Sequence, residues 1–103
     1  MLNLPSEVVQ HFGYALYLAQ IGRRHESTKV LKGQGDEGLL EITQSRRGNA
    51  YRAIYTIRFT EAVFVLHVFQ KKSKSGRATP RTDLALVERR LREAARIAAE
   101  MNS

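Results

Sequence analysis

The stretch that decides the fold is YRAIYTIRFTEAVFVLHVFQ, residues 51–70. Its first part, Tyr51 to Phe59, alternates between aromatic or apolar residues on one side and a second set, containing both arginines, on the other. That period of two is typical of a β-strand. The second part, Ala62 to Gln70, is β-branched or aromatic almost throughout, as in a strand covered on both faces. Thr60-Glu61 leaves only a tight link, so we predict an antiparallel hairpin.

Further elements are indicated on both sides of this hairpin. Upstream, GLLEIT (residues 38–43) reads as a short strand and SRRGN (residues 45–49) as the turn that follows it. Residues 5–21 carry apolar side chains at helical spacing between Pro5 and Gly22. The polar segment RRHESTKVLKG, residues 23–33, could hold a short second helix. Downstream, Thr79 is a natural N-cap and Pro80 suits the first position of a long helix.

The order of these elements predicts one α+β domain spanning residues 1–103. It consists of an N-terminal α-hairpin, an antiparallel three-stranded meander and a C-terminal helix. The chain has no cysteine, which excludes disulfides, thiol nucleophiles and Cys-based metal sites. We expect a cytoplasmic protein, since no apolar run approaches the roughly 18 residues of a membrane span and no secretory signal pattern opens the chain. We expect no cofactor.

Charge indicates the class of partner. Seventeen Lys and Arg against ten Asp and Glu give a net charge of +7, which favours a polyanion over an acidic protein or a merely solvated surface. In the predicted hairpin, Arg52 lies beside the end of the next strand, close to Phe69, Gln70 and Lys71, and Lys72 follows directly. Arg and Lys there could grip an RNA backbone, whose own 2′-hydroxyl supplies a nucleophile. Further phosphate-binding candidates are the surrounding cations Arg46, Arg47, Arg58, Lys74, Arg77 and Arg81.

The histidines give a weaker signal. His67 lies on the strand face of Val65 and Phe69, where a packed, hydrogen-bonded histidine is more common than a catalytic one. His11 and His25 fall in the first helix and in a basic segment. No pair has the spacing of metal ligands, so we predict no metal site.

The block from Asn49 to Glu93, with GLLEIT and VLKGQG upstream, resembles the phage-derived Gp49-like branch of the RelE/HigB toxins. The most specific elements of the resemblance are Tyr51-Arg52, VLHVFQKKS (residues 65–73) and Thr79-Pro80. It implies a compact RelE-like microbial-RNase fold and the toxin role in a type II toxin–antitoxin system. It also implies a metal-independent endoribonuclease that cleaves mRNA in the ribosomal A site through 2′-hydroxyl attack and so inhibits translation.

The resemblance assigns roles residue by residue. Arg52 matches the strand arginine that contacts the scissile phosphate, and Lys71 or Lys72 matches the basic residue at the end of the next strand. The family implies a helix-turn-helix antitoxin as partner. Two departures from the family stand out. The chain enters its first helix almost directly, so we expect either that the first strand is absent or that the chain is truncated, and a second copy could cover the sheet edge that a missing strand would expose. Glu41 and Thr43 also stand where relatives commonly carry basic residues.

Two other functions fit the same sequence. A ParE-like protein of this fold would inhibit DNA gyrase without catalysis. A degenerate phage remnant would bind an antitoxin and cleave nothing.

Overall fold

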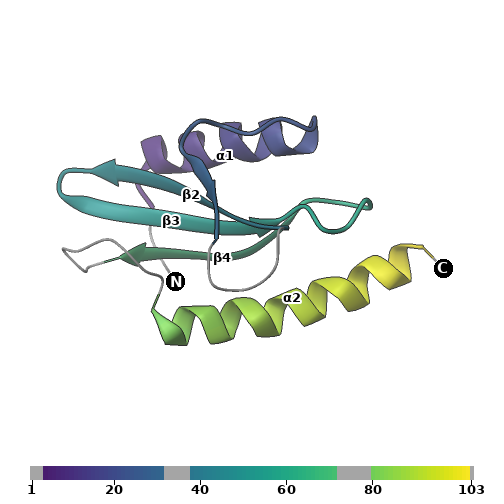
Figure 1. The fold of residues 1–103 in the computed structure, drawn as a ribbon. Helices are drawn as coiled ribbons and strands as arrows, with labels where there is room; N and C mark the ends of the chain where they lie inside the picture. Colours follow the sequence, from purple (N-terminus) through teal and green to yellow (C-terminus); the bar gives the residue numbers. More distant parts are fainter. Residues whose placement is uncertain (1–3, 32–37, 72–79, 103) are drawn as a thin grey trace.

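A four-stranded antiparallel sheet forms the middle layer of the protein, with one helix packed on each face (Figure 1). The computed structural model describes residues 4–31, 38–71 and 80–102. The described elements, in chain order, are α1 (Ser6–Gln20), β1 (Thr28–Val30), β2 (Leu39–Arg46), β3 (Asn49–Thr56), β4 (Phe64–Lys71) and α2 (Arg81–Met101). The strands lie side by side in the order β1-β2-β3-β4. The predicted α+β class and antiparallel meander are therefore confirmed.

The predicted α-hairpin is wrong in its second half, the segment that follows α1. Its described residues, 23–31, contain no helix, and Thr28–Val30 instead pairs antiparallel with β2. The physical reason is that Thr28 and Val30 are β-branched and find open backbone groups along the edge of β2. The pairing extends to Ser27, whose carbonyl oxygen accepts a hydrogen bond from the Thr43 amide at 3.3 Å. The sheet therefore has a fourth strand. The prediction about a first strand before α1 concerns residues 1–3, which lie outside the described residues.

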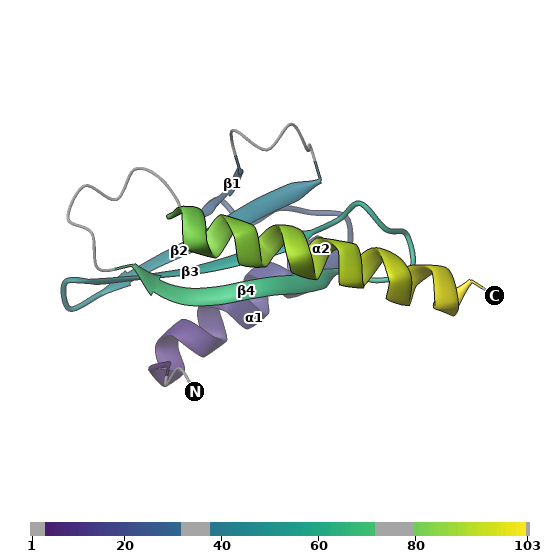
Figure 2. The same cartoon turned by 90° about the horizontal axis from the view of Figure 1, so that it is seen from below.

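The alternation predicted for β3 organises the two cores. Tyr51, Ala53 and Tyr55 point to α1, where they pack with Val8 and Phe12. The intervening positions face α2, and Ile54 belongs to a second cluster. That second cluster is made of the buried side chains Leu31, Leu39, Ile54, Leu66, Phe69, Val87 and Ala94. Figure 2 shows α2 lying along β4 on this face. Strand periodicity thus separates the chain into an α1 face and an α2 face of the sheet.

The connections differ in length from those predicted. The turn between β2 and β3 is reduced to Arg47 and Gly48, with φ angles of 52° and 80°. Two consecutive positive φ angles are the signature of a type I′ turn, which suits a tight antiparallel hairpin. Between β3 and β4 the predicted Thr60-Glu61 link is instead a loop over residues 57–63. β3 ends at Thr56, before the predicted strand end at Phe59, and Ile57 and Arg58 are exposed.

Candidate active site

The pairing of β3 with β4 brings Arg52 and the end of β4 together at one end of the sheet. Arg52 lies opposite Phe69, Tyr51 opposite Gln70 and Ala50 opposite Lys71. The predicted placement of Arg52 beside Phe69, Gln70 and Lys71 is confirmed in the backbone register. The side chain of Lys71 and the residues Lys72, Lys74 and Arg77 lie outside what the structure describes.

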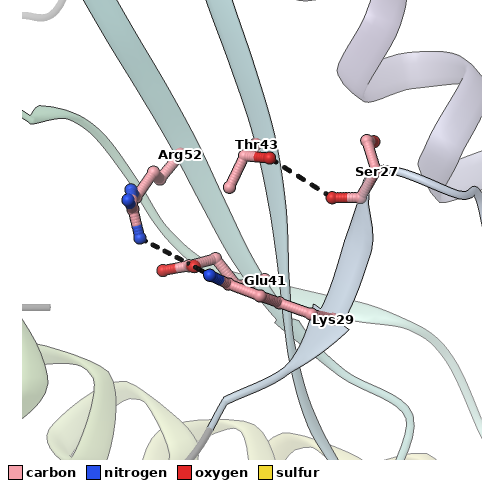
Figure 3. A network of polar contacts seen from close by, with 5 residues as sticks. All are labelled: Ser27, Lys29, Glu41, Thr43 and Arg52. Atoms are coloured by element: carbon pink, nitrogen blue, oxygen red, sulfur yellow. Dashed lines mark hydrogen bonds and ion pairs between the residues drawn. The ribbon is translucent and has the colours of Figure 1, made fainter. Parts of the chain in front are cut away.

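Arg52 is buried against a carboxylate. Its Nη1 donates to Oε1 of Glu41 at 2.8 Å, and the two residues are only 6% and 1% exposed. The Nζ of Lys29 on β1 approaches the same oxygen at 3.8 Å (Figure 3). Two cations from neighbouring strands therefore converge on one buried anion. The buried carboxylate of Glu41 thus offsets much of the charge of Arg52.

Other predicted phosphate-binding residues are dispersed. Arg46 lies on the α1 face, where its Nε donates to Glu7 at 3.0 Å. Arg47 is exposed in the turn that follows β2. Arg58 was expected on the strand face of Arg52, but β3 ends at Thr56 and Arg58 lies beside Gly38 at the far end of the sheet. Arg81 opens α2 and is exposed on the same side of the sheet as Arg52. The structure therefore does not gather these four cations into one cluster.

His67 has partners that the sequence did not indicate. Its Nε2 lies 2.7 Å from Oδ1 of Asp83 in the first turn of α2. Its Nδ1 lies 3.2 Å from Nη1 of Arg90, two turns further along that helix. The ring also stacks on Phe69, with centroids 4.9 Å apart and planes 14° from parallel. Sixteen residues separate His67 from Asp83, so only the docking of α2 on β4 brings the pair together.

The α2 face therefore carries two polar groups near one another. Phe69 stands opposite Arg52, and His67 lies two residues from Phe69 along β4. Diagonal neighbours of this kind have Cα atoms roughly 7–8 Å apart. One group is the Glu41–Arg52 pair and the other is the Asp83–His67–Arg90 chain. An imidazole with an oriented carboxylate, next to fixed cations, is a combination suited to acid–base chemistry on a phosphate ester.

Comparison with protein families places this chain. The model of the family described as "Phage derived protein Gp49-like (DUF891)" matches residues 1–92. The chain belongs to this family. The Gp49-like family is associated with toxin–antitoxin systems, which supports a toxin role in general terms. Searches of curated proteins and of solved structures found no significant match.

The Gp49-like chain carries a second polar cluster, on its α1 side. Nε2 of His11 and Nδ1 of His25 lie 3.0 and 2.8 Å from the same Ser27 hydroxyl oxygen. The Ser27 amide also donates to Nδ1 of His25 at 3.0 Å. Burial and the neighbouring His25 lower the pKa of His11. This cluster joins α1 to the start of β1 and lies away from the Arg52 face.

The lowered pKa of His11 predicts an acid-sensitive fold. The unfolded chain binds a proton at His11 more readily than the folded one, so the free energy of unfolding decreases as pH falls below about 6.5, the ordinary histidine value. Urea unfolding between pH 8 and pH 5 measures the loss. In His11→Gln the loss over this range should be smaller than in the unchanged protein. An identical pH dependence in both proteins would contradict the assignment.

Two absences complete the description of this Gp49-like protein. Within residues 4–31, 38–71 and 80–102, no three His, Cys, Asp or Glu side chains gather as metal ligands would. In the same ranges neither helix combines the length and the apolar character needed to cross a membrane.

Proposed function

We propose that this protein is the toxin of a type II toxin–antitoxin system and acts as a ribosome-dependent mRNA endoribonuclease of the RelE/HigB type. The observation that carries the proposal is the β3–β4 register. In this register Arg52 lies near the end of β4, after which the Lys- and Arg-rich residues 72–77 follow in the sequence, and on the face that also holds His67 and Asp83. Membership of a toxin-associated family and the net charge of +7 support it.

In this proposal the RNA brings its own nucleophile. The 2′-hydroxyl attacks the adjacent phosphorus, and the products are a 2′,3′-cyclic phosphate and a free 5′-hydroxyl. Lys71 and Lys72 are proposed to contact the scissile phosphate, with Lys74, Arg77 and Arg81 along the flanking backbone. Arg52 is bound to Glu41 and would have to break this ion pair to contact a phosphate directly. We therefore propose that Arg52 stays in place and acts on the phosphate as a fixed positive charge.

Partners follow from the same proposal. The substrate is mRNA in the ribosomal A site, and a helix-turn-helix antitoxin neutralises the toxin. The sheet edges, formed by the short strand β1 on one side and β4 on the other, are the proposed contact for a second copy.

Inducible expression in bacteria tests the proposal. We expect growth arrest, loss of protein synthesis and primer-extension stops within translated codons. Co-expression of the antitoxin encoded next to this gene should restore growth. Arrest of DNA replication with intact mRNA would contradict the endoribonuclease.

One observation favours a second candidate. Because Glu41 offsets the charge of Arg52, the face could serve binding without catalysis, as in a ParE-like gyrase inhibitor. A supercoiling assay with purified gyrase separates the two functions. Inhibition of supercoiling together with intact mRNA would favour this candidate.

A further inference from the structure

The hydrogen bonds of His67 fix which ring nitrogen carries the proton. A guanidinium only donates, so the contact from Arg90 Nη1 at 3.2 Å requires a lone pair on Nδ1. The carboxylate of Asp83 only accepts, so the proton of a neutral ring lies on Nε2, 2.7 Å from Oδ1. Asp83 therefore holds the imidazole in one tautomer, with Nδ1 as its basic nitrogen. This is the arrangement by which a carboxylate prepares a histidine for general base catalysis.

The surroundings of Nδ1 differ from those of Nε2. The His67 side chain is 12% exposed and Asp83 is 23% exposed, so the pair is largely withdrawn from solvent. Arg90, which covers Nδ1, is an exposed helix residue that also donates to the Leu66 carbonyl at 2.8 Å. When Arg90 moves away it gives up its hydrogen bonds to Nδ1 and to the Leu66 carbonyl, and a contact with the substrate phosphate can offset this loss. The basic nitrogen is therefore reached from the surface by displacing one cation, and that cation would itself bind a phosphate.

A β-bulge sets the position of His67. Ile54 pairs with His67, and Tyr55 pairs with Val65, so Leu66 is the extra residue on β4. Leu66 enters the core between sheet and α2, while His67 reaches the seam where α2 begins. Bulges commonly re-aim side chains next to functional sites. A plain core histidine on a regular strand would need no such irregularity.

We propose that His67 is the general base of the endoribonuclease and that Asp83 is its positioning residue, an inference that rests on the function proposed above. Nδ1 removes the proton of the 2′-hydroxyl while the bond between O2′ and phosphorus forms. The bond between phosphorus and the 5′ oxygen breaks, and this oxygen takes a proton from solvent. Arg90 moves from Nδ1 to the phosphate and, with Arg52, offsets the developing negative charge. The proton on His67 then returns to solvent.

Single-turnover cleavage of a defined mRNA on purified ribosomes tests this role. We expect His67→Asn to lower the cleavage rate by about 10²–10⁴-fold, the usual contribution of a general base. The ribosome concentration at half-maximal rate should not change, because the substituted group acts in the chemical step. Added imidazole should restore part of the rate of His67→Ala. His11→Asn, which removes a comparable imidazole from the α1 side, is the matched control and should cleave at the unchanged rate.

Asp83→Asn tests the positioning role with a side chain of the same size. Its amide can donate to Nε2, which moves the ring proton to Nδ1 and removes the base while the contact remains. We expect a loss of at least about tenfold in rate, with the thermal unfolding midpoint retained. If the unchanged protein cleaves and both His67→Asn and Asp83→Asn cleave within about threefold of it, His67 is not the base and the proposed function stands. If the unchanged protein cleaves no mRNA, the proposed function fails and this inference fails with it.

Discussion

Replacing Arg52 with alanine should lower the free energy of unfolding by about 3–5 kcal/mol, since removing one partner of a buried ion pair leaves an uncompensated charge. The charge left behind is Glu41, which is 1% exposed and receives the Arg52 guanidinium at 2.8 Å. Lys29 cannot replace this contact fully because it approaches from the edge at 3.8 Å and is 60% exposed. Urea unfolding followed by circular dichroism measures the difference.

The double variant Glu41→Leu with Arg52→Met is the control. Apolar residues of similar volume avoid the cost of burying both charges, so its stability should equal or exceed that of the unchanged protein. The single variants Glu41→Leu and Arg52→Met, together with the double variant, complete a thermodynamic cycle that isolates the coupling between the two residues. A stability loss below about 1 kcal/mol for Arg52→Ala would show that the pair is not structural.

This result decides how a growth assay is interpreted. A non-toxic Arg52→Ala variant is uninformative if it is unfolded, whereas the double variant is expected to keep the fold while lacking both charges of the pair. If the double variant still arrests growth, Arg52 has no catalytic role. If it is folded and harmless, toxicity requires the Glu41–Arg52 pair and not only a stable fold.

The sequence predicted the parts of the fold that rest on local periodicity. The alternation over Tyr51 to Thr56 assigns those side chains correctly to the two faces, because every second residue of a strand points the same way. Strand β1 could not be predicted in this way, since three residues show no period and its pairing depends on a partner already in place. The second helix was predicted there because the polar composition suits an exposed helix as well as an edge strand.

The Glu41–Arg52 pair was within reach of the sequence. With a two-residue turn at Arg47 and Gly48, Arg46 faces Asn49, and counting three residues back along each strand places Thr43 opposite Arg52. Glu41 is then a diagonal neighbour on the same face. The broader turn assigned to residues 45–49 left this register open, because an arginine rarely takes a positive φ. The His67–Asp83 contact is different, since it depends on where a helix docks and no local signal encodes that.

Replacing the four cations at and after the end of β4 with alanine should abolish most of the affinity for RNA. In the proposed interface Lys71, Lys72, Lys74 and Arg77 each neutralise a phosphate, and every such contact on single-stranded RNA adds about 0.7 to the slope of log affinity against log salt. Changing all four to alanine should therefore reduce the slope by roughly three units. If the salt-independent part of binding is unchanged, affinity at about 0.1 M salt falls on the order of a thousandfold.

Fluorescence anisotropy with a labelled single-stranded RNA, repeated at several salt concentrations, measures both quantities. The matched control changes the exposed cations Arg23, Arg24, Arg89 and Arg92 to alanine. It also removes four positive charges from the net +7, but from the end of α1 and the outer surface of α2. A local interface predicts that this control keeps nearly the full slope, because charges more than a Debye length of about 10 Å from the RNA are screened. Equal losses in both variants would mean that net charge alone attracts the RNA, and the edge beside Arg52 would then have no special role.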